Sequence, residues 1–325
     1  MKILIVGGAG MIGRKLTSRL LSDGCLGDRR INAITLFDVV KADVPESAGI
    51  PVRALSGDIA DAETVAQLAS DCPDVVFHLA AVVSGEAEAD FDLGYRTNLD
   101  GTRLLLDTFR QAAYVPRFVF TSSIAVFGAP FPEAIGDEFH LTPLTSYGTQ
   151  KAVGELLLND YSRRGLLDGV GIRLPTICVR PGRPNKAASG FFSNIIREPL
   201  VGQEAVLPVG DEVRHWHASP RSAVGFLLHA ATMNTGELGP RRNLTMPGLS
   251  VTVAEQIAAL QKVAGDKAVK LIRREPNELI IRMVSGWPQN FSADRARRLG
   301  FSADESFEAI IRAHMEDERI NCPFL

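Results

Sequence analysis

The sequence predicts an α/β protein with a doubly wound parallel sheet and a smaller C-terminal α/β part. Three observations support this fold class: short β-branched runs alternate with helical stretches, the first run ends in glycines, and the pattern becomes loop-rich after Pro175. Strands that alternate with helices are joined by right-handed crossovers, which make the strands parallel and place helices on both faces of the sheet.

The expected elements follow in chain order. The strands are five short apolar runs: Ile3–Val6, Ala33–Phe37, Val75–Leu79, Phe118–Thr121 and Gly171–Leu174. The helices have apolar residues at helical spacing and cover Met11–Leu21, Thr64–Ala69, Thr97–Ala113, Ser146–Arg163, Ser219–Met233, Val253–Ala264 and Glu305–His314. We assign residues 1–175 to a first domain, to which some later segments can return, and residues 176–325 mainly to a second part.

Composition excludes several classes of protein. The chain has 325 residues, a net charge of −3 and 46% hydrophobic residues, which is typical of a globular protein and not of a disordered one. It has no run of basic residues for nucleic acid and no apolar stretch of the ~20 residues that a membrane helix needs. Four separated cysteines form no metal motif, so we expect free, buried thiols, no metal and a cytoplasmic location.

The glycine-rich segment that follows the first strand is typical of a Rossmann-type dinucleotide site. Glycines let the backbone turn tightly and approach a pyrophosphate, and the helix that follows presents free N–H groups to the anion. The alternative is an ordinary tight turn between a strand and a helix. The candidate residues of this site are Gly7, Gly10, Met11, Ile12 and Gly13.

Acidic residues at two strand ends extend this prediction to the choice of cofactor. Asp38 ends the second strand, where its carboxylate can accept hydrogen bonds from ribose hydroxyls and repel a 2′-phosphate. NAD is therefore favoured over NADP, although Lys41 nearby keeps NADP as the minority alternative. Gly57, Asp58 and Ile59 end a further expected strand, between Ala33–Phe37 and Val75–Leu79. Asp58 and Ile59 are expected to bind the cofactor, with Asp58 against the adenine.

A tyrosine, a lysine and a serine form the candidate catalytic group. Tyr147 and Lys151 are four residues apart in an expected helix, so both side chains lie on one face. A neighbouring ammonium favours the phenolate and lowers the pKa of the tyrosine toward that of a useful base. Ser123 ends a strand at the sheet edge where such proteins bind ligands. The alternative for Tyr147 and Lys151 is a solvated helix face.

With these motifs in order, the sequence resembles the extended short-chain dehydrogenases/reductases. The resemblance covers nearly the whole chain and implies catalytic roles for Ser123, Tyr147 and Lys151. It also implies NAD as cofactor, with contacts from Leu79, Ala80, Ala81, Asn98, Tyr147, Lys151 and Pro175. For Asn98 the alternative is a buried polar residue satisfied by the backbone.

Departures from the family pattern narrow the reaction. Ile124 and Ala125 stand where dehydratases of the family have an Asp-Glu pair, and the stretch from Arg214 to Pro220 lacks the acidic residues of nucleotide-sugar enzymes. The loop from Arg180 onward resembles that of the D-erythronate dehydrogenase group. This resemblance implies NAD-dependent oxidation of the C2 hydroxyl of a small sugar acid, D-erythronate, to 2-oxo-tetronate. The candidate substrate-binding residues are Ser123, Tyr147, Arg180, Asn185, Ser189, Arg214 and His215.

Two alternative functions and one assembly complete the predictions. A nucleotide-sugar 4-epimerase would retain its NAD and form no net NADH. A non-catalytic, dinucleotide-sensing regulator would need none of the three catalytic residues. By analogy with the family we expect a homodimer that pairs through the helices Thr97–Ala113 and Ser146–Arg163.

Overall fold

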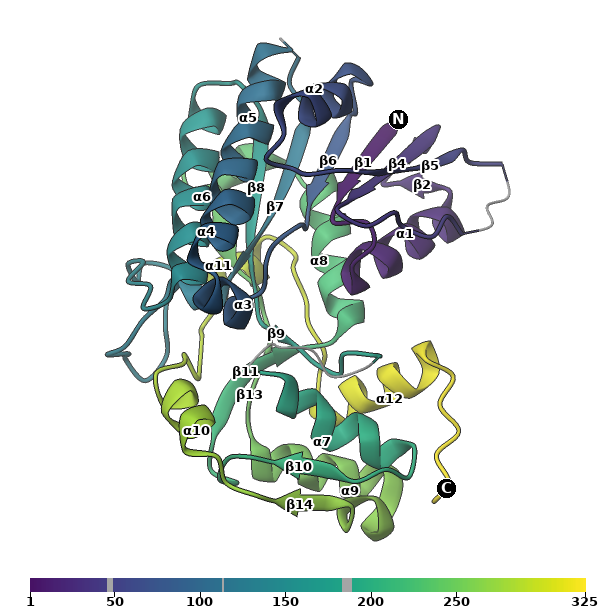
Figure 1. The fold of residues 1–325 in the computed structure, drawn as a ribbon, viewed down its shortest axis with the longest axis vertical. Coiled ribbons are helices and arrows are strands. Elements are labelled where there is room, and N and C mark those ends of the chain that lie inside the picture. Colours follow the sequence, from purple (N-terminus) through teal and green to yellow (C-terminus); the bar gives the residue numbers. More distant parts are fainter. Residues whose placement is uncertain (46–48, 113, 183–188) are drawn as a thin grey trace.

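One parallel sheet of seven strands lies at the centre of the first part of the molecule (Figure 1). The computed structural model describes residues 1–45, 49–112, 114–182 and 189–325. The strands have the order β12-β8-β7-β6-β1-β4-β5, and every neighbouring pair is parallel. Their bounds are β1 Lys2–Val6, β4 Ala33–Asp38, β5 Val52–Ser56, β6 Val75–His78, β7 Arg117–Ser123, β8 Asp168–Leu174 and β12 Asn243–Thr245. The predicted doubly wound sheet is confirmed.

The sheet order reverses at β1, which pairs with β4 on one side and β6 on the other. The connections that leave the neighbouring strands β1 and β6 go to opposite faces of the sheet. A crevice therefore opens at the carboxyl end of β1. This crevice is the position at which a doubly wound sheet binds its ligand.

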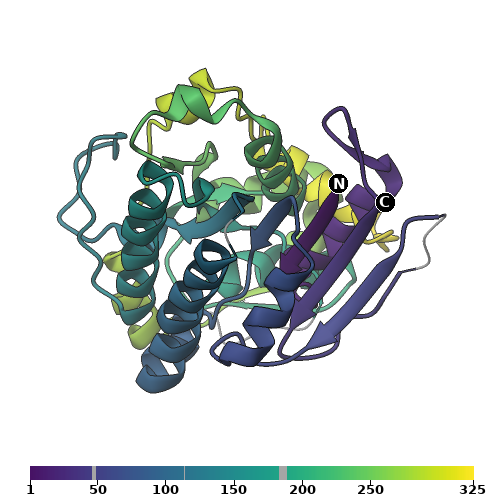
Figure 2. The same ribbon diagram turned by 90° about the horizontal axis from the view of Figure 1, so that it is seen from above.

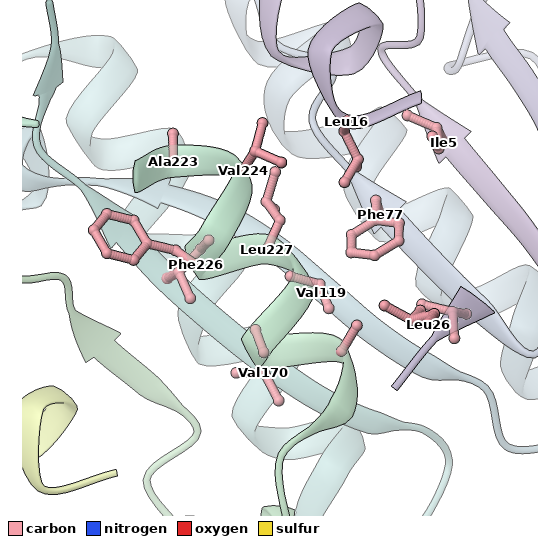
Figure 3. Close-up of a cluster of buried hydrophobic side chains, with 14 of the residues drawn as sticks. Ile5, Leu16, Leu26, Phe77, Val119, Val170, Ala223, Val224, Phe226 and Leu227 are labelled. Carbon is pink, nitrogen blue, oxygen red and sulfur yellow. The ribbon is translucent and has the colours of Figure 1, made fainter. Parts of the chain in front are cut away.

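Alternate residues of the strands supply the two apolar faces of the sheet. Ile5 and Phe77 belong to one buried cluster, in which they pack with Leu16 of one helix and Leu227 of another (Figure 3). Leu4 and other residues one position out of phase belong to a second cluster on the opposite face. Because successive strand side chains point to opposite faces, these short apolar runs cover both sides at once.

Helices cover both faces. The cluster of Figure 3 lies under α1 Met11–Asp23, α8 Pro220–Thr232 and α11 Asp294–Arg298. The opposite face is covered by α2 Ala62–Ser70, α5 Gly101–Gln111 and α6 Ser146–Arg163, and α5 and α6 run side by side in Figure 2. Short segments α3 Ser84–Ala89, α4 Phe91–Gly94 and the π-helix η1 Tyr95–Asp100 lead into α5. The helix predicted over Thr97–Ala113 therefore begins as a π-turn, and Ala113 lies outside the described residues.

The second part has its own core, formed around α7 Gly190–Leu200, α9 Val253–Val269 and α12 Phe307–Asp317. A parallel pair, β10 Ala205–Leu207 and β14 Ile272–Arg274, packs beside α7. Three strands, β9 Thr176–Ile177, β11 Arg214–Ala218 and β13 Leu249–Thr252, form a small sheet between the two parts (Figure 1). Helix α10 Glu278–Ser285 lies beside this small sheet (Figure 1). In the first part, β2 Cys25–Leu26 pairs with β3 Arg29–Arg30.

Three later segments, α8, α11 and β12, contribute to the first part although they follow residue 175. Helix α8 packs on β7 and β8, and β12 adds the seventh strand beside β8. The division of the chain at residue 175 stays a prediction in this form.

The cysteines differ in part from the expectation of four buried thiols. All four are free, and Cys178 and Cys322 are buried, but Cys72 is exposed and Cys25 is half-buried. Within the described ranges, no cluster of three or more His, Cys, Asp or Glu side chains has the arrangement of a metal site. None of the helices that the structure describes combines the length and hydrophobicity that a membrane crossing requires.

Candidate active site

A cavity of about 380 Å³ opens beyond the carboxyl ends of β6, β7 and β8, between the large sheet and the second part. Its size is within the range of small-molecule sites. The predicted site residues that line it are Met11, Ile12, Leu79, Ala81, Ser123, Tyr147, Lys151, Pro175, Arg180, Ser189 and His215.

The glycine turn joins the end of β1 to α1 at close range. Gly7 has a φ of 95°, and the N–H groups of Gly7 and Gly8 both donate to the carbonyl oxygen of Phe37, at 2.7 and 3.0 Å. A Cβ at Gly13 would lie 2.3 Å from the Gly7 oxygen, so only glycine lets the helix pack this tightly. Because no side chain caps α1, its first N–H groups are available at the crevice.

Asp38 is held beside this turn by two backbone groups. One carboxylate oxygen accepts from the N–H of Ala9 at 3.0 Å, and the other accepts from the N–H of Val39 at 2.8 Å. Each oxygen can accept a further hydrogen bond. A carboxylate fixed beside a glycine turn fits the hydroxyls of a ribose, and its charge would repel a phosphate at the same position.

Asp58 and Ile59 are engaged by the protein itself. Asp58 forms an ion pair with Arg96 and accepts from the N–H of Ala60 at 2.8 Å. Ile59 is buried in the core, where a Cβ at Gly101 would lie 2.6 Å from its side chain. The structure therefore places Ile59 as a packing residue, and sequence reasoning missed the Arg96 partner of Asp58 because it comes from a distant helix.

Asn98 and Ala80 support the cofactor side without lining the cavity. Asn98 is buried, accepts from the N–H of Val82 at 2.8 Å and donates to Gln150 of α6 at 2.7 Å. It therefore braces the loop after β6 against the helix that carries Tyr147. The backbone of Ala80 packs directly against Gly7, since a Cβ there would lie 2.6 Å from the Ala80 nitrogen.

Ser123 and Tyr147 meet at the base of the cavity. The hydroxyl oxygen of Ser123 accepts from the N–H of Ala125 at 3.1 Å, which orients it at the end of β7. Burial raises the pKa of Tyr147, and a hydrogen bond with Ser123 and the positive charge of Arg180 oppose this rise. Sequence reasoning expected Lys151 to lower this pKa, whereas in the structure the pKa is raised overall and the opposing influences come from Ser123 and Arg180.

Lys151 is buried one turn after Tyr147. Its ammonium donates to the carbonyl oxygen of Thr121 at 2.8 Å and lies 5.8 Å from the centre of the Tyr147 ring. Burial lowers the pKa of Lys151 to about 8, and the negative charge of Glu155 opposes that shift. The lysine is thus fixed between the end of β7 and the face of α6 that bears the tyrosine.

Arg180 is a half-buried cation at the cavity wall. Its guanidinium donates to the carbonyl oxygen of Ile177 at 3.0 Å and to the hydroxyl of Ser189 at 2.8 Å. Within the part of the chain that the structure describes, no carboxylate forms an ion pair with it, and burial lowers the pKa of its guanidinium. A half-buried cation without a counter-ion among the described residues favours an anionic ligand.

Arg214 does not reach the cavity. It donates to the carbonyl oxygen of Ser250 at 2.7 Å and pairs with Glu255 at 3.3 Å. Arg214 and His215 are neighbours on β11, so their side chains point to opposite faces, and the cavity receives His215. The prediction that both residues bind one substrate therefore conflicts with strand geometry. Asn185, the remaining substrate candidate, lies outside the described residues.

Thr176 and Trp287 line the cavity and were missed by sequence reasoning. Thr176 follows Pro175 at the end of β8, which is a position that the strand-end rule could have identified. Trp287 comes from the loop after α10, and no local pattern connects that loop with the site. Trp216, by contrast, is a packing residue, because its indole is buried and donates to the carbonyl oxygen of Met246 at 3.1 Å.

Comparison with known proteins agrees with this geometry. The sequence profile described as the NAD dependent epimerase/dehydratase family matches residues 3–239. A D-erythronate dehydrogenase of Cupriavidus necator is 48% identical over 98% of both chains. Another, from Haemophilus influenzae, is 42% identical over 97% of this chain and 99% of its own.

Solved structures show the same fold. The structure of a nucleoside-diphosphate-sugar epimerase from Agrobacterium tumefaciens has a TM-score of 0.96 at 64% identity, and covers 98% of this chain and 94% of its own. An L-threonine 3-dehydrogenase of Trypanosoma brucei has a TM-score of 0.84 at 21% identity, over 97% and 96% of the two chains, which shows a shared fold alone. This chain is therefore a member of the NAD dependent epimerase/dehydratase family.

Proposed function

We propose that the protein is an NAD-dependent dehydrogenase that oxidises the C2 hydroxyl of D-erythronate to give 2-oxo-tetronate. The observation that carries this proposal is the cation Arg180, without a carboxylate partner among the described residues, on the same cavity wall as Tyr147 and Ser123. A small hydroxy acid supplies both the anion that Arg180 needs and a hydroxyl for Tyr147. The two relatives named D-erythronate dehydrogenase, which this chain matches along nearly its full length, support the same substrate.

The residues at the crevice fit NAD. The glycine turn leaves room for a pyrophosphate beside the first N–H groups of α1, and Asp38 offers its two oxygens to ribose hydroxyls. Leu79, Ala81 and Pro175 would border the nicotinamide end, where the cavity lies. When bound there, NAD supplies the chemistry of a hydride acceptor.

Residues of this chain perform the remaining steps. Arg180 binds the carboxylate of the substrate and thereby fixes C2 relative to the helix that bears Tyr147. Ser123 holds the C2 oxygen of the substrate by a hydrogen bond, and the Tyr147 oxygen takes the proton of the C2 hydroxyl. Ser123 and Arg180 favour the phenolate of Tyr147 in this buried setting, and Lys151, fixed by Thr121, holds its ammonium 5.8 Å from the centre of the tyrosine ring.

The direct test measures NADH formation by the purified protein. We expect NADH from D-erythronate and NAD, and much less NADPH when NADP replaces NAD. UDP-glucose serves as the control, because the relative at 64% identity is named a nucleoside-diphosphate-sugar epimerase. Conversion of the nucleotide sugar without net NADH, together with no turnover of any four-carbon acid, would replace the dehydrogenase by the epimerase.

We further propose a homodimer that pairs through α5 and α6. Near these helices Phe91 and Leu156 are 58% and 62% exposed, and they provide apolar surface that a second copy can bury. Sedimentation velocity at working concentrations tests this assembly, and a species of about 35 kDa alone would exclude it. The free thiols are consistent with the reducing cytoplasm, which cell fractionation can test.

A further inference from the structure

Thr176 and His215 form a hydrogen-bonded pair in the wall of the cavity that also contains Arg180 and Tyr147. The Thr176 hydroxyl oxygen lies 2.7 Å from Nε2 of His215. On the other side of the ring, Nδ1 of His215 lies 3.0 Å from the carbonyl oxygen of Pro288. Neither residue is needed for the hydride or proton transfer described above.

The surroundings of His215 determine which partner donates. A carbonyl oxygen can only accept, so Nδ1 carries the hydrogen. Burial lowers the pKa of His215 to about 4, so the ring is neutral at pH 7 and Nε2 carries a lone pair. The Thr176 hydroxyl must therefore donate its only hydrogen to His215. Titratable or charged groups near the ring are Arg180 and His217, and the positive charge of Arg180 further disfavours protonation of His215.

The ring of His215 is also held against rotation. It stacks on Phe192 with ring centres 5.3 Å apart and planes 3° from parallel, and Trp287 lies 5.3 Å away on the side of the cavity. A flipped ring would place Cδ2 against the Pro288 oxygen and Cε1 against the Thr176 hydroxyl, so both hydrogen bonds of the buried ring would be lost. The direction of the Thr176 hydroxyl is thus fixed before any ligand binds.

The pair gives the cavity a defined pattern of donors and acceptors. Arg180 offers only donors, whereas the Thr176 oxygen, its hydrogen engaged, offers only lone pairs. A carboxylate is stable at the first position and is repelled at the second, where two acceptors would meet. A substrate hydroxyl is stable at the second position because it can donate.

We propose that Thr176, oriented by His215, determines substrate specificity: it accepts a hydrogen bond from a hydroxyl at C3 or C4 of the sugar acid. It thereby selects hydroxylated acids over their deoxy analogues and over dicarboxylic acids. This inference rests on the proposed function, because it assigns the second recognition point of the same substrate. It adds a residue that the sequence motifs do not mark.

The experiment compares wild type with Thr176→Val, which keeps the shape of the side chain and removes the acceptor. The matched control is Thr176→Ser, which keeps the hydroxyl. The probes are D-erythronate and two deoxy acids. Of these, 2,4-dihydroxybutanoate lacks the C3 hydroxyl and 2,3-dihydroxybutanoate lacks the C4 hydroxyl. Both kcat/KM and the dissociation constants from calorimetry are measured. Wild type and Thr176→Ser should prefer D-erythronate by about 10- to 100-fold over the deoxy acid that lacks the hydroxyl bound by Thr176.

In Thr176→Val that preference should fall to within about threefold, since the partner of the hydroxyl is gone. An equal loss for all three acids, or an unchanged preference, would overturn the inference. Failure of wild type to oxidise any of these acids would instead contradict the proposed function.

A second variant keeps the inference testable if Thr176→Val does not fold. His215→Phe retains the stack on Phe192 and frees the hydrogen of Thr176, which can then be donated to a ligand. Tartrate has a second carboxylate, and its affinity relative to that of D-erythronate should be at least tenfold higher in His215→Phe than in wild type. If His215→Phe discriminates between the two acids as wild type does, His215 does not set the direction of the Thr176 hydroxyl.

Discussion

Arg173 donates three hydrogen bonds to Glu155, from Nε to Oε1 at 2.9 Å and to Oε2 at 3.1 Å and from Nη2 to Oε2 at 2.7 Å, and both side chains are buried. The same carboxylate accepts from the hydroxyl of Ser122 at 2.5 Å. One side chain of α6 thus ties the ends of β7 and β8 together, next to Ser123 and one turn beyond Lys151. The positions of the candidate catalytic residues depend on this buried pair.

Loss of one partner of this pair should destabilise the protein strongly. Glu155→Gln leaves the Arg173 charge buried without a counter-ion, so the free energy of unfolding should fall by about 3–5 kcal/mol. Urea unfolding measures this change. The control is Glu278→Gln, whose ion pair with Arg282 is almost fully exposed, and it should change stability by less than about 0.5 kcal/mol. A double variant Glu155→Gln/Arg173→Gln as unstable as the sum of the single variants would contradict the pairing.

Arg180 and Arg214 should differ sharply in their effect on substrate binding. Arg180→Gln removes the cation at the cavity, so KM for D-erythronate should rise about 100-fold while the dissociation constant of NAD changes little. Arg214→Gln is the matched control, because Arg214 is paired with Glu255 on the opposite face of β11 and should leave KM within about twofold. Steady-state kinetics and calorimetry with NAD measure both effects. Equal losses in the two variants would show that Arg180 is not the clamp.

Removal of the tyrosine hydroxyl should abolish turnover and spare cofactor binding. In Tyr147→Phe no group takes the C2 proton, so kcat should fall by about 10²- to 10⁴-fold. The dissociation constant of NAD should stay within about twofold of wild type. Tyr161→Phe is the control, since Tyr161 donates to Asp107 outside the cavity. Turnover of Tyr147→Phe at the wild-type rate would exclude this residue as the proton acceptor.

Asp38 should set the preference for NAD. Asp38→Asn removes the negative charge that opposes a 2′-phosphate, so the ratio of kcat/KM for NAD to that for NADP should fall at least tenfold. The exposed Asp43 lies in the same loop, and Asp43→Asn should leave the ratio unchanged. We expect a loss of affinity for NAD to account for most of the fall in this ratio, because Asn can keep only one of the two backbone hydrogen bonds that Asp38 accepts. An unaltered ratio in Asp38→Asn would place the selection elsewhere.

Acid should destabilise the protein through its buried histidines. Burial lowers the pKa of His78 to about 3 and those of His215 and His314 to about 4. The unfolded chain binds protons on these groups below about pH 6.5, and the folded protein does not, so stability falls as pH falls from 6.5 toward 4.

The His78→Gln variant isolates one of these contributions. It keeps an amide near the hydroxyl of Thr102, which contacts Nε2 of His78 at 2.8 Å, and removes one titrating group. Between pH 6 and 4 the slope of unfolding free energy should decrease by about 1.4 kcal/mol per pH unit. His140→Gln changes an exposed histidine and serves as the control. A slope for His78→Gln equal to that of wild type would show that His78 is protonated in the folded protein.

Local sequence patterns determined much of the fold. The alternation of apolar runs with helical stretches located the main strands and helices, because hydrophobic periodicity reflects which side of each element is buried. Gly7 and Gly13 marked the turn after β1, since only glycine tolerates the backbone angle and the close packing there. The spacing of Tyr147 and Lys151 placed both on one helix face, which is a property of the helix alone.

Contacts between distant segments decided the rest. Sequence gave no reason to separate Arg180 from Arg214, and only the pairing of β11 with β9 and β13 showed which one reaches the cavity. Thr176, His215 and Trp287 meet although they come from three separate segments, and Asp58 is paired with Arg96 of a distant helix. Such contacts depend on how chain segments return in space, and the periodicity of a single segment holds no record of that path. The sequence by itself therefore determined the glycine turn and the helix that bears Tyr147 and Lys151, whereas the tertiary structure decided which side chains line the cavity.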